Sequence, residues 1–219
     1  MREDAWLAEQ LGMPVHTVEP GDAALDAGPG LYQAKVPCAD LARLRALEDA
    51  GMRVVDVNVT LRRPAGPSGV DTTGVRDARP ADRDAILTLA ERDYPGSRFH
   101  LDPQIPDERA NALKRAWVDG FFAGARGDRM LVADRDGEAI GFYLVIDGDD
   151  HRTGDLLAVV PGARRAGTAT ALVGTALDMR PLRDHQMGTQ VSNIPSLRFF
   201  ERLGFSIVDS RYVLHGHVG

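Results

Sequence analysis

The stretch LAVVPGARRAGTATALV, from Leu157 to Val173, carries the pattern on which the interpretation of the fold depends. An apolar run stops at Val160 and Pro161, two glycines and two arginines follow, and a second apolar run begins near Gly167. The first run predicts a strand and the second a helix, with a short loop between them. The first amides of such a helix lack partners within the helix and carry partial positive charge. The junction therefore predicts a binding place for an anion.

The composition of the loop points to phosphate groups. Small side chains let a ligand approach the backbone closely, and two arginines add donors suited to phosphate oxygens. The spacing from Gly162 to Gly167 matches a P-loop, but Thr168 and Ala169 replace its Lys and its Ser or Thr. A dinucleotide fingerprint is absent. We interpret residues 161–169 as a diphosphate cradle, and an ordinary turn with solvated arginines is the alternative.

Composition narrows the class of protein. The chain has 219 residues, 43% of them hydrophobic and 26% charged, as in globular proteins. A net charge of −6 argues against a general nucleic-acid binder. No apolar run approaches the roughly 18 residues of a membrane span, and the N-terminus lacks the apolar core of a signal peptide. The single cysteine, Cys38, fits a reducing cytoplasm and is interpreted as structural. We expect a cytoplasmic protein without nucleic-acid or membrane partners.

Outward from the junction, apolar periodicity predicts a mixed α/β domain in the order β-α-α-β-β-β-α-β-α-β. Asp136 and Gly137 mark the turn of a hairpin. The expected elements are strand 75–80, helices 81–93 and 106–124, hairpin 128–147, strand 154–160, helix 167–179, strand 186–192, helix 194–203 and strand 205–215.

The first part of the chain predicts a smaller α/β unit that contains no such cradle. We expect a strand over 30–36, a helix over 39–50 and a strand over 52–61. The stretch RRPAGPSGVDTTG, Arg62 to Gly74, has the composition of a linker. The expected organisation is a small N-terminal domain at 1–65, a linker at 66–73 and the main domain at 74–219.

This N-terminal unit echoes the end of the chain. LEDAGMRVVDVNVTL (Leu47–Leu61) and FERLGFSIVDSRYVL (Phe200–Leu214) share five of fifteen positions. Average composition gives roughly one match by chance. Two interpretations stay open: a diverged copy of half of the main domain, or two helix-Gly-strand units that converged on the same capping chemistry. A copy predicts that its strands extend the main sheet or pack on it.

Two motifs carry a resemblance to a known family. The junction is similar to the acyl-CoA-binding motif L-x-V-x-P-x-x-[QR]-x-x-G-x-[GA] of the GNAT acyltransferases. It matches at Leu157, Val159, Pro161, Arg164, Gly167 and Ala169. The later motif of the family, N-x-x-[AS]-x-x-x-[YF]-E-x-x-G-F, is matched by Asn193, Ser196, Phe200, Glu201, Gly204 and Phe205. The resemblance covers Val75 to the C-terminus and implies the GNAT acyltransferase fold.

The resemblance implies acyl-CoA, most simply acetyl-CoA, as co-substrate, and no metal. Backbone near Leu157 and Val159 would hold the pantetheine arm, so the neighbouring strand must separate, often at a bulge. Asn193 would hold the same arm, and a helix N-cap is its alternative role. The expected cofactor-binding residues are Leu157, Val159, Arg164, Arg165, Ala166, Gly167, Thr168, Ala169, Asn193 and Phe200.

The implied reaction is direct attack of an amine on the thioester, helped by a backbone N–H that stabilises the oxyanion. Candidates for the base are Asp155, His100 and His151, with water or backbone as alternatives. The usual tyrosine acid of the family is replaced by Phe200, which has no proton to donate. Tyr212 and Tyr143 are substitutes for it.

The sequence thus predicts an N-acyltransferase that acts on a small-molecule amine. The stretch SRFHLDPQIP (Ser97–Pro106), the N-terminal domain and TQVSN resemble the branch that acetylates nucleotide-linked amino sugars, such as TDP-fucosamine acetyltransferase. An aminoglycoside or another small amine is a second acceptor class, which the acidic stretch DGDDH (Asp147–His151) suits. A non-catalytic acyl-CoA-binding module is a third reading, because of Phe200. A homodimer is compatible with all three.

Overall fold

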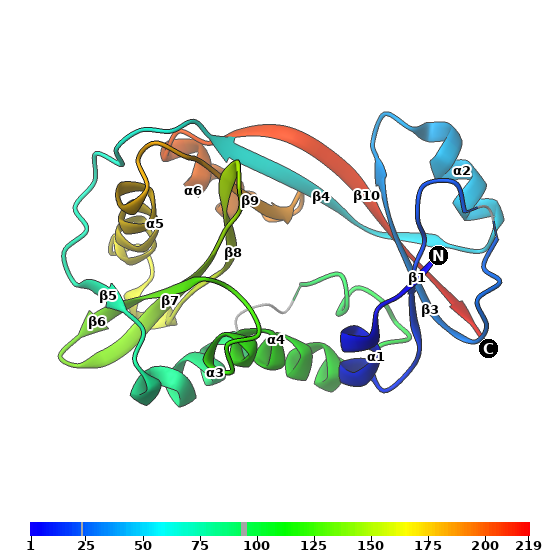
Figure 1. The fold of residues 1–219 in the computed structure, drawn as a ribbon, viewed down its shortest axis with the longest axis horizontal. Coiled ribbons are helices and arrows are strands. Elements are labelled where there is room, and N and C mark those ends of the chain that lie inside the picture. The colour runs from blue at the N-terminus through cyan, green and yellow to red at the C-terminus, as the bar shows by residue number, and fades with distance from the viewer. Residues whose placement is uncertain (23, 93–95) are drawn as a thin grey trace.

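The computed structural model describes residues 1–22, 24–92 and 96–219, which form one ten-stranded sheet with six α-helices (Figure 1). The strands are β1 (Arg2–Glu3), β2 (Val15–Thr17), β3 (Gly30–Pro37), β4 (Arg53–Arg63), β5 (Val75–Asp77), β6 (Arg129–Arg135), β7 (Glu138–Asp147), β8 (His151–Val159), β9 (Asp184–Gln190) and β10 (Ser206–Val218). The helices are α1 (Ala5–Leu11), α2 (Leu41–Asp49), α3 (Arg83–Arg92), α4 (Asp107–Phe122), α5 (Thr168–Met179) and α6 (Ile194–Arg202).

The strands lie in the order β1-β2-β3-β10-β4-β9-β8-β7-β6-β5. The pairs β2–β3 and β8–β9 are parallel and the other pairs are antiparallel, which confirms the mixed sheet. The predicted hairpin is present, and Asp136 (φ 55°) and Gly137 (φ 89°) have the positive φ values of a type I′ turn. Residue 93, the last of the predicted helix 81–93, lies outside the described residues.

The sequence did not predict α1, β1 and β2. The signals for α1 were present: Asp4 caps the helix by accepting from Leu7 N at 3.1 Å, and Gly12 (φ 66°) ends it. The helix has seven residues and two buried leucines, so its apolar period is short. Its position depends on packing against α4 rather than on a strong local pattern.

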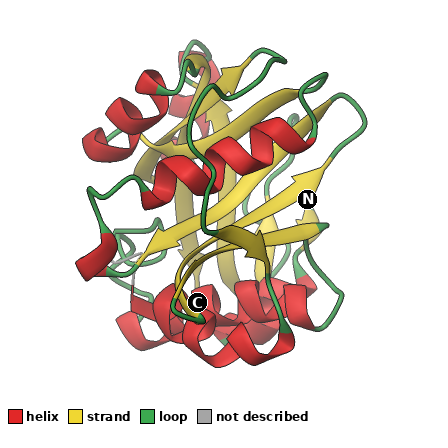
Figure 2. Cartoon of the chain, turned by 90° about the vertical axis from the view of Figure 1, so that its left-hand side faces the viewer, coloured by secondary structure: helices red, strands yellow, loops and turns green. Residues whose placement is uncertain are grey.

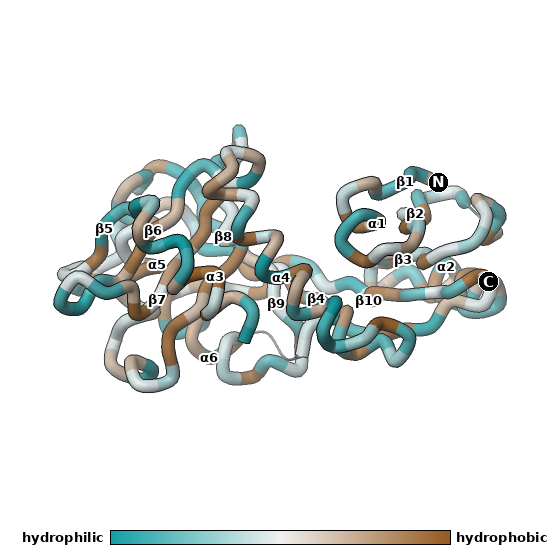
Figure 3. The backbone as a smooth tube through the Cα atoms, turned by 90° about the horizontal axis from the view of Figure 1, so that it is seen from below, coloured by the Kyte–Doolittle hydropathy of each residue, from teal (hydrophilic) through white to brown (hydrophobic). Residues whose placement is uncertain are grey.

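Helices cover both faces of the sheet (Figure 2). Helices α5, α6 and α2 lie on the α5 face, where two apolar clusters pack around Phe200 and Leu47. Helices α3, α4 and α1 lie on the α4 face, where two other clusters pack around Phe142 and Leu113. Seen from below, α4 lies across the middle of the molecule (Figure 3), and its contacts with α3 and α1 join the two ends. No described helix is long and apolar enough to cross a membrane.

The N-terminal strands belong to the main sheet, and their pairing repeats that of the C-terminal ones. The elements β3, α2 and β4 correspond in order to β9, α6 and β10. The echo aligns Asn58 with Arg211, and the same offset aligns Pro37 with Gln190. In the sheet, Asn58 pairs with Gln190 and Arg211 pairs with Pro37, so the two pairs correspond to each other. Strands β4 and β10 pair antiparallel at the centre of this arrangement. The register therefore has an approximate two-fold symmetry.

The irregularities of the pairing are repeated as well. One register shift leaves Val208 without a partner residue on β4, and the other leaves Val55 without one on β10. These two valines occupy matching positions in the echo between Leu47–Leu61 and Phe200–Leu214. Asp40 and Asn193 also match, and each caps the helix that follows it. Convergence on capping chemistry alone would not place a bulge at the same aligned position, so these matches favour a diverged half-copy.

The segment between β4 and β5 is irregular, as predicted, but it is packed against α5. Ser68 N and Oγ each donate to the carboxylate of Asp178 at 2.7 Å. Val70 lies so close to Gly174 that a Cβ there would overlap it. The domain boundaries at residues 65 and 74 stay a prediction, and the segment between them is held to the main part of the chain.

A chain that begins at Thr72 lacks β4, the strand that lies between β9 and β10. We expect it to lose cooperative folding, because both neighbouring strands would expose unpaired N–H and C=O groups. Circular dichroism with thermal melting measures this. Co-expression of residues 1–71 with residues 72–219 is the control, since the two fragments together contain every strand. A shortened chain that melts cooperatively with native-like helix content would contradict the role given to β4.

Candidate active site

Strands β8 and β9 separate part-way along their length. Their parallel pairing runs from His151–Asp184 to Gly154–Met187 and ends there, although β8 continues to Val159 and β9 to Gln190. Beyond Gly154 the two strands have no register with each other. The separation expected next to the cradle is therefore present, and we call its closed end at Gly154 and Met187 the vertex.

Two features of β8 coincide at the vertex. Leu156 lies opposite Leu144 and Gly154 opposite Val145, so Asp155 is an extra residue in a β-bulge. A Cβ on Gly154 would overlap the hydroxyl of Tyr143, so only glycine fits over this ring. The bulge changes the direction of β8, and the tyrosine fills the space beneath it. Together they fix the point at which β8 leaves β9.

A buried aromatic group lies on the α5 face of the vertex. The Tyr143 hydroxyl and His185 Nε2 are 2.7 Å apart, and both side chains are buried. Burial raises the pKa of Tyr143 and lowers the pKa of His185 to about 3, so the pair is neutral near pH 7. Phe205 contacts the His185 ring edge-on, and Phe200 contacts Phe205 with centroids 5.2 Å apart. Phe200 is thus part of the wall of this group.

The cradle has the backbone geometry of an anion site. Gly167 (φ 84°) precedes α5 in the left-handed region, and no side chain caps the helix. Helix α4 also lacks a side-chain cap, whereas Asp4, Asp40 and Asn193 cap α1, α2 and α6. The exposed N-terminus of α5 therefore offers its amides to a ligand from outside. Open space surrounds Gly167, where an added Cβ would meet no atom within 4 Å.

The side chains of the cradle have distinct positions. Arg164 and Arg165 are both exposed, and Arg164 Nε donates to Val159 O at 2.9 Å. Thr168 Oγ1 donates to Ala163 O at 2.9 Å and closes the loop. Ala166 is exposed, whereas Ala169, Leu157 and Val159 pack in or against the core under α5. Both arginines thus lie beside the uncapped helix, as the motif implied.

Asn193 has the capping role that the sequence left open. Its Oδ1 accepts from Ser196 N at 3.3 Å, at the start of α6. Its Nδ2 donates to Thr189 Oγ1 on β9, also at 3.3 Å. The side chain is half-buried and joins the open end of β9 to α6.

Of the candidate bases in the sequence, Asp155 lies at the vertex. Both of its carboxylate oxygens accept from Arg126, at 2.7 and 2.8 Å. The guanidinium of Arg126 lies 4.5 Å from the centre of the Trp117 ring, and Lys114 Nζ lies at the same distance from that ring. Burial, and then the charge of Arg98, lowers the pKa of Lys114 to about 8. Asp155 is therefore held in a cationic environment.

The structure places His100 and Tyr212 elsewhere, and His151 lies at the start of β8. Both ring nitrogens of His100 are engaged, with Ser97 Oγ at 2.7 Å and Asn111 Oδ1 at 2.9 Å. Tyr212 lies between Val36 and Val57 in the sheet and packs with the cluster under α2. Neither side chain meets Asp155, Phe200 or the cradle. Among the tyrosines considered as acids, Tyr143 is the one at the vertex.

Comparison with known proteins identifies the family. The model of the acetyltransferase (GNAT) family matches residues 83–205, which contain the vertex, the cradle and Asn193. The chain belongs to the GNAT acetyltransferase family. Members of this family use acyl-CoA as co-substrate and act on amine acceptors.

Two relatives have names that point to different roles. The chain is 28% identical over 188 residues to the spore coat polysaccharide biosynthesis protein SpsD of Bacillus subtilis, which covers 83% of this chain and 64% of that protein. It is 27% identical over 223 residues to the mycothiol acetyltransferase of Clavibacter sepedonicus, which covers 95% of this chain and 65% of that enzyme. The chain thus spans slightly less than two thirds of the length of these relatives.

Solved structures share the fold. A GCN5-related N-acetyltransferase from Sphaerobacter thermophilus has a TM-score of 0.58 at 16% identity, over 87% of this chain and 60% of that one. A tandem GNAT protein from the clavulanic acid biosynthesis pathway has a TM-score of 0.53 at 15% identity, over 86% of this chain and 64% of that one. These similarities confirm the GNAT fold class.

Sequence reasoning missed the partners of the site residues. Arg126 and Asp155 are far apart in sequence, and so are Tyr143 and His185, so no local pattern joins them. One available signal was Gly154 at the start of an apolar strand. A glycine inside a strand marks a bulge or a close approach, and both are present here.

Replacing Gly154 by Ala should destabilise the fold by about 1–3 kcal/mol, because the added methyl overlaps Tyr143. Urea unfolding measures the change. The loss should be smaller in a Tyr143→Phe background, where the overlapping oxygen is gone. The matched control is Gly162→Ala, where an added Cβ meets nothing within 4 Å. Equal stabilities of the Gly154 and Gly162 variants would contradict the proposed close contact.

The buried His185 should make the fold sensitive to acid. Its pKa falls from an ordinary 6.5 to about 3 on folding, chiefly through burial. Between these pH values the unfolded chain binds a proton that the folded chain does not, so stability falls by up to about 1.4 kcal/mol per pH unit as the pH is lowered. Above pH 6.5 both states are neutral and the contribution is constant. His185→Gln should flatten the dependence of the unfolding free energy on pH in this range. Unchanged slopes would show that His185 is not the group responsible.

Proposed function

We propose that this chain transfers an acetyl group from acetyl-CoA directly to the amine of a nucleotide-linked amino sugar in the cytoplasm. The observation that supports acyl-CoA binding best is the separation of β8 from β9 beside the uncapped N-terminus of α5. An open strand edge and a free set of helix amides next to each other suit a long thioester with a diphosphate at its far end. Acetyl-CoA supplies the activated acyl group.

Three parts of the chain would hold this co-substrate. The amides of Gly167 to Ala169, with Thr168 and Ala166 beside them, accept the diphosphate, and Arg164 and Arg165 add charge-assisted hydrogen bonds. Backbone near Leu157 and Val159 orients the pantetheine arm along the open edge of β8. Asn193 would hold the other side of that arm from β9, besides its role as a cap. Phe200, in the aromatic wall, bounds the space near the thioester.

The chemical step requires an oriented amine and a stabilised oxyanion. The bulge at Asp155 interrupts the ladder at the vertex and supports a backbone N–H there as the oxyanion donor. The Asp155 carboxylate, fixed by Arg126, is placed to attract and orient an amine before attack. His100 and Tyr212 lie away from the vertex, so Asp155 is better placed than either for this role.

The departing thiolate needs little help. A thiol with a pKa of about 8.5 leaves far more readily than an alkoxide. Tyr143, whose hydroxyl lies beneath Gly154 and bonds His185, is the side chain best placed to supply a proton, with water as the alternative. The phenylalanine at position 200 is thus compatible with catalysis.

The polysaccharide role named for SpsD supports an amino-sugar acceptor. The similarity to a mycothiol acetyltransferase supports acyl transfer in general.

Replacing Arg164 by Ala should weaken acetyl-CoA binding by about 1–3 kcal/mol, or roughly 5- to 150-fold, through the loss of a charged hydrogen bond. Isothermal titration calorimetry measures the affinity. Arg135→Ala, which removes an exposed arginine near the β6–β7 turn, is the control of equal charge and should bind normally. An Arg164 variant with unchanged affinity would refute the placement of the cradle.

A further inference from the structure

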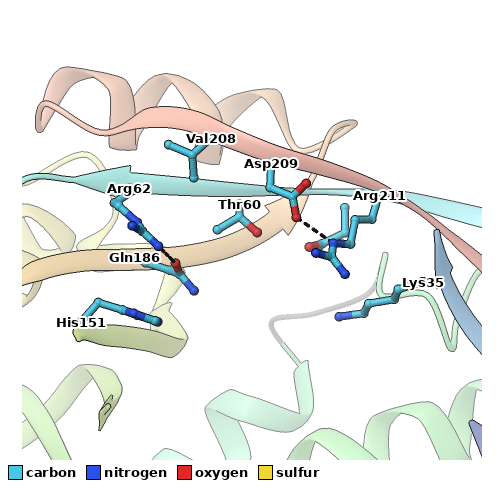
Figure 4. Close-up of a pocket in the computed structure, with 9 residues that line it drawn as sticks. Lys35, Thr60, Arg62, His151, Gln186, Val208, Asp209 and Arg211 are labelled. Atoms are coloured by element: carbon cyan, nitrogen blue, oxygen red, sulfur yellow. Dashed lines mark hydrogen bonds and ion pairs between the residues drawn. The ribbon is translucent and has the colours of Figure 1, made fainter. Parts of the chain in front are cut away.

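A pocket lies on the α4 face of the sheet, beside the vertex (Figure 4). Its volume is about 600 Å³, and residues of β3, β4, β8, β9 and β10 line it. Gln186 on its wall directly precedes Met187, where β9 parts from β8, and His151 lies at the start of β8. A molecule in this pocket would therefore lie next to the reacting end of the opening.

The charge of the lining is unbalanced. Arg211 Nε is 2.7 Å from Asp209 Oδ2, so these two side chains neutralise each other. Lys35 and Arg62 line the same pocket, and neither forms an ion pair within the part of the chain that the structure describes. Two positive charges thus face the pocket without a paired carboxylate.

Arg62 shows the lack of an anion most directly. Its Nη2 donates to the amide oxygen of Gln186 at 3.0 Å, which is a neutral acceptor. Its Nε is buried and has no hydrogen-bond partner among the described residues. A buried charged donor without an acceptor is unfavourable unless a ligand or water completes it. The guanidinium of Arg62 can therefore donate a hydrogen bond from Nε to an acceptor that enters the pocket.

Lys35 experiences further positive charge. Burial, and then Arg98 and Arg211, lowers its pKa, and Asp56 only partly opposes them. Arg98 lies over the Phe99 ring with its Cζ 4.6 Å from the centre, and burial lowers its pKa to about 10. Burial also raises the pKa of Asp56, and the hydrogen bond from Val57 N and the charges of Arg98 and Lys35 oppose this only in part. Asp56 therefore offsets the repulsion among these cations only in part.

The segment that carries Arg98 is fixed in position. Asp102 Oδ2 is 2.7 Å from His215 Nδ1 and 2.9 Å from His217 Nε2, both on β10. Burial alone would raise the pKa of Asp102, but the hydrogen bonds from the two histidines lower it, so the carboxylate is ionised. Arg98 is therefore held near Lys35 by a buried anchor.

The cations are spread along the sheet. Arg211 lies opposite Asn58 on β4, and Arg62 lies four residues further along the same strand. At roughly 3.3 Å per residue this separates the two backbone positions by about 13 Å along the sheet. Their long side chains shorten this gap, and the several oxygens of a diphosphate can accept from more than one Arg or Lys donor, which a single carboxylate does less well.

We propose that this pocket binds the diphosphate of a phosphorylated acceptor through Lys35 and Arg62, with Arg211 at its rim. The inference rests on the proposed function, which supplies the amine at the vertex. It gives the N-terminal half-copy a function, because Lys35 is on β3 and Arg62 on β4. A polycationic acceptor such as an aminoglycoside would meet like charges in this pocket.

The test uses the full chain saturated with coenzyme A, so that the cradle is filled and no turnover takes place. Calorimetry measures binding of uridine diphosphate glucosamine as the probe. Lys35→Gln and Arg62→Gln should each weaken binding at least tenfold, and the double variant more. Arg45→Gln, an exposed arginine of α2, is the matched control and should bind normally. Glucosamine without phosphate should be insensitive to all of these substitutions.

Thermal melting separates binding from folding. Neutralising an uncompensated cation should leave the melting temperature unchanged or raise it, so weaker binding with a normal melting temperature supports the proposal. A double variant that is folded and binds the probe as tightly as the unchanged chain overturns it, whatever its activity with acetyl-CoA. Failure of the proposed function looks different: no amine is acetylated, while probe binding still depends on Lys35 and Arg62.

Discussion

The position of β4 between β9 and β10 is the constraint on which the rest of the structure depends. Strand β9 hydrogen-bonds to β4 along one edge, so it stays ordered where its other edge parts from β8. Without β4, an opening in the middle of the sheet would leave β9 as an unsupported strand with unpaired backbone groups. The N-terminal segment is therefore part of the architecture that keeps the opening between β8 and β9 stable, even though it lies far from the cradle in sequence.

The two faces of the sheet carry different energetic roles. The α5 face is mainly apolar, with Phe200, Leu61 and Leu214 buried under its helices, and it also buries His185 and Arg152. The α4 face is apolar at its two ends and polar in the middle, where the pocket lies. Unpaired cations there lower stability through their repulsion, and the apolar clusters at either end offset this loss. Such a distribution is typical of a surface retained for binding rather than for folding.

The aromatic group of Tyr143, His185, Phe205 and Phe200 shows how the structure accommodates a phenylalanine at position 200. Phe200 replaces the tyrosine of the family motif, and its ring is fully used in packing against Phe205. A hydroxyl is present elsewhere in the same region, on Tyr143, where it bonds His185 directly beneath the vertex. The packing ring and the buried hydroxyl thus come from two residues, one on α6 and the other on β7.

The sequence by itself determined the order of elements from β5 to β10, the cradle and the hairpin turn, because these depend on local periodicity, capping and turn chemistry. It also contained the echo of Leu47–Leu61 in Phe200–Leu214, but not its meaning. Only the tertiary structure decided that β4 pairs with β10 and β9, that Arg126 holds Asp155, and that Tyr212 lies away from the vertex. It alone brought Lys35, Arg62 and Arg211 to one pocket. These arrangements depend on contacts between residues distant in the chain, and neither periodicity nor motif spacing specifies which distant strands become neighbours.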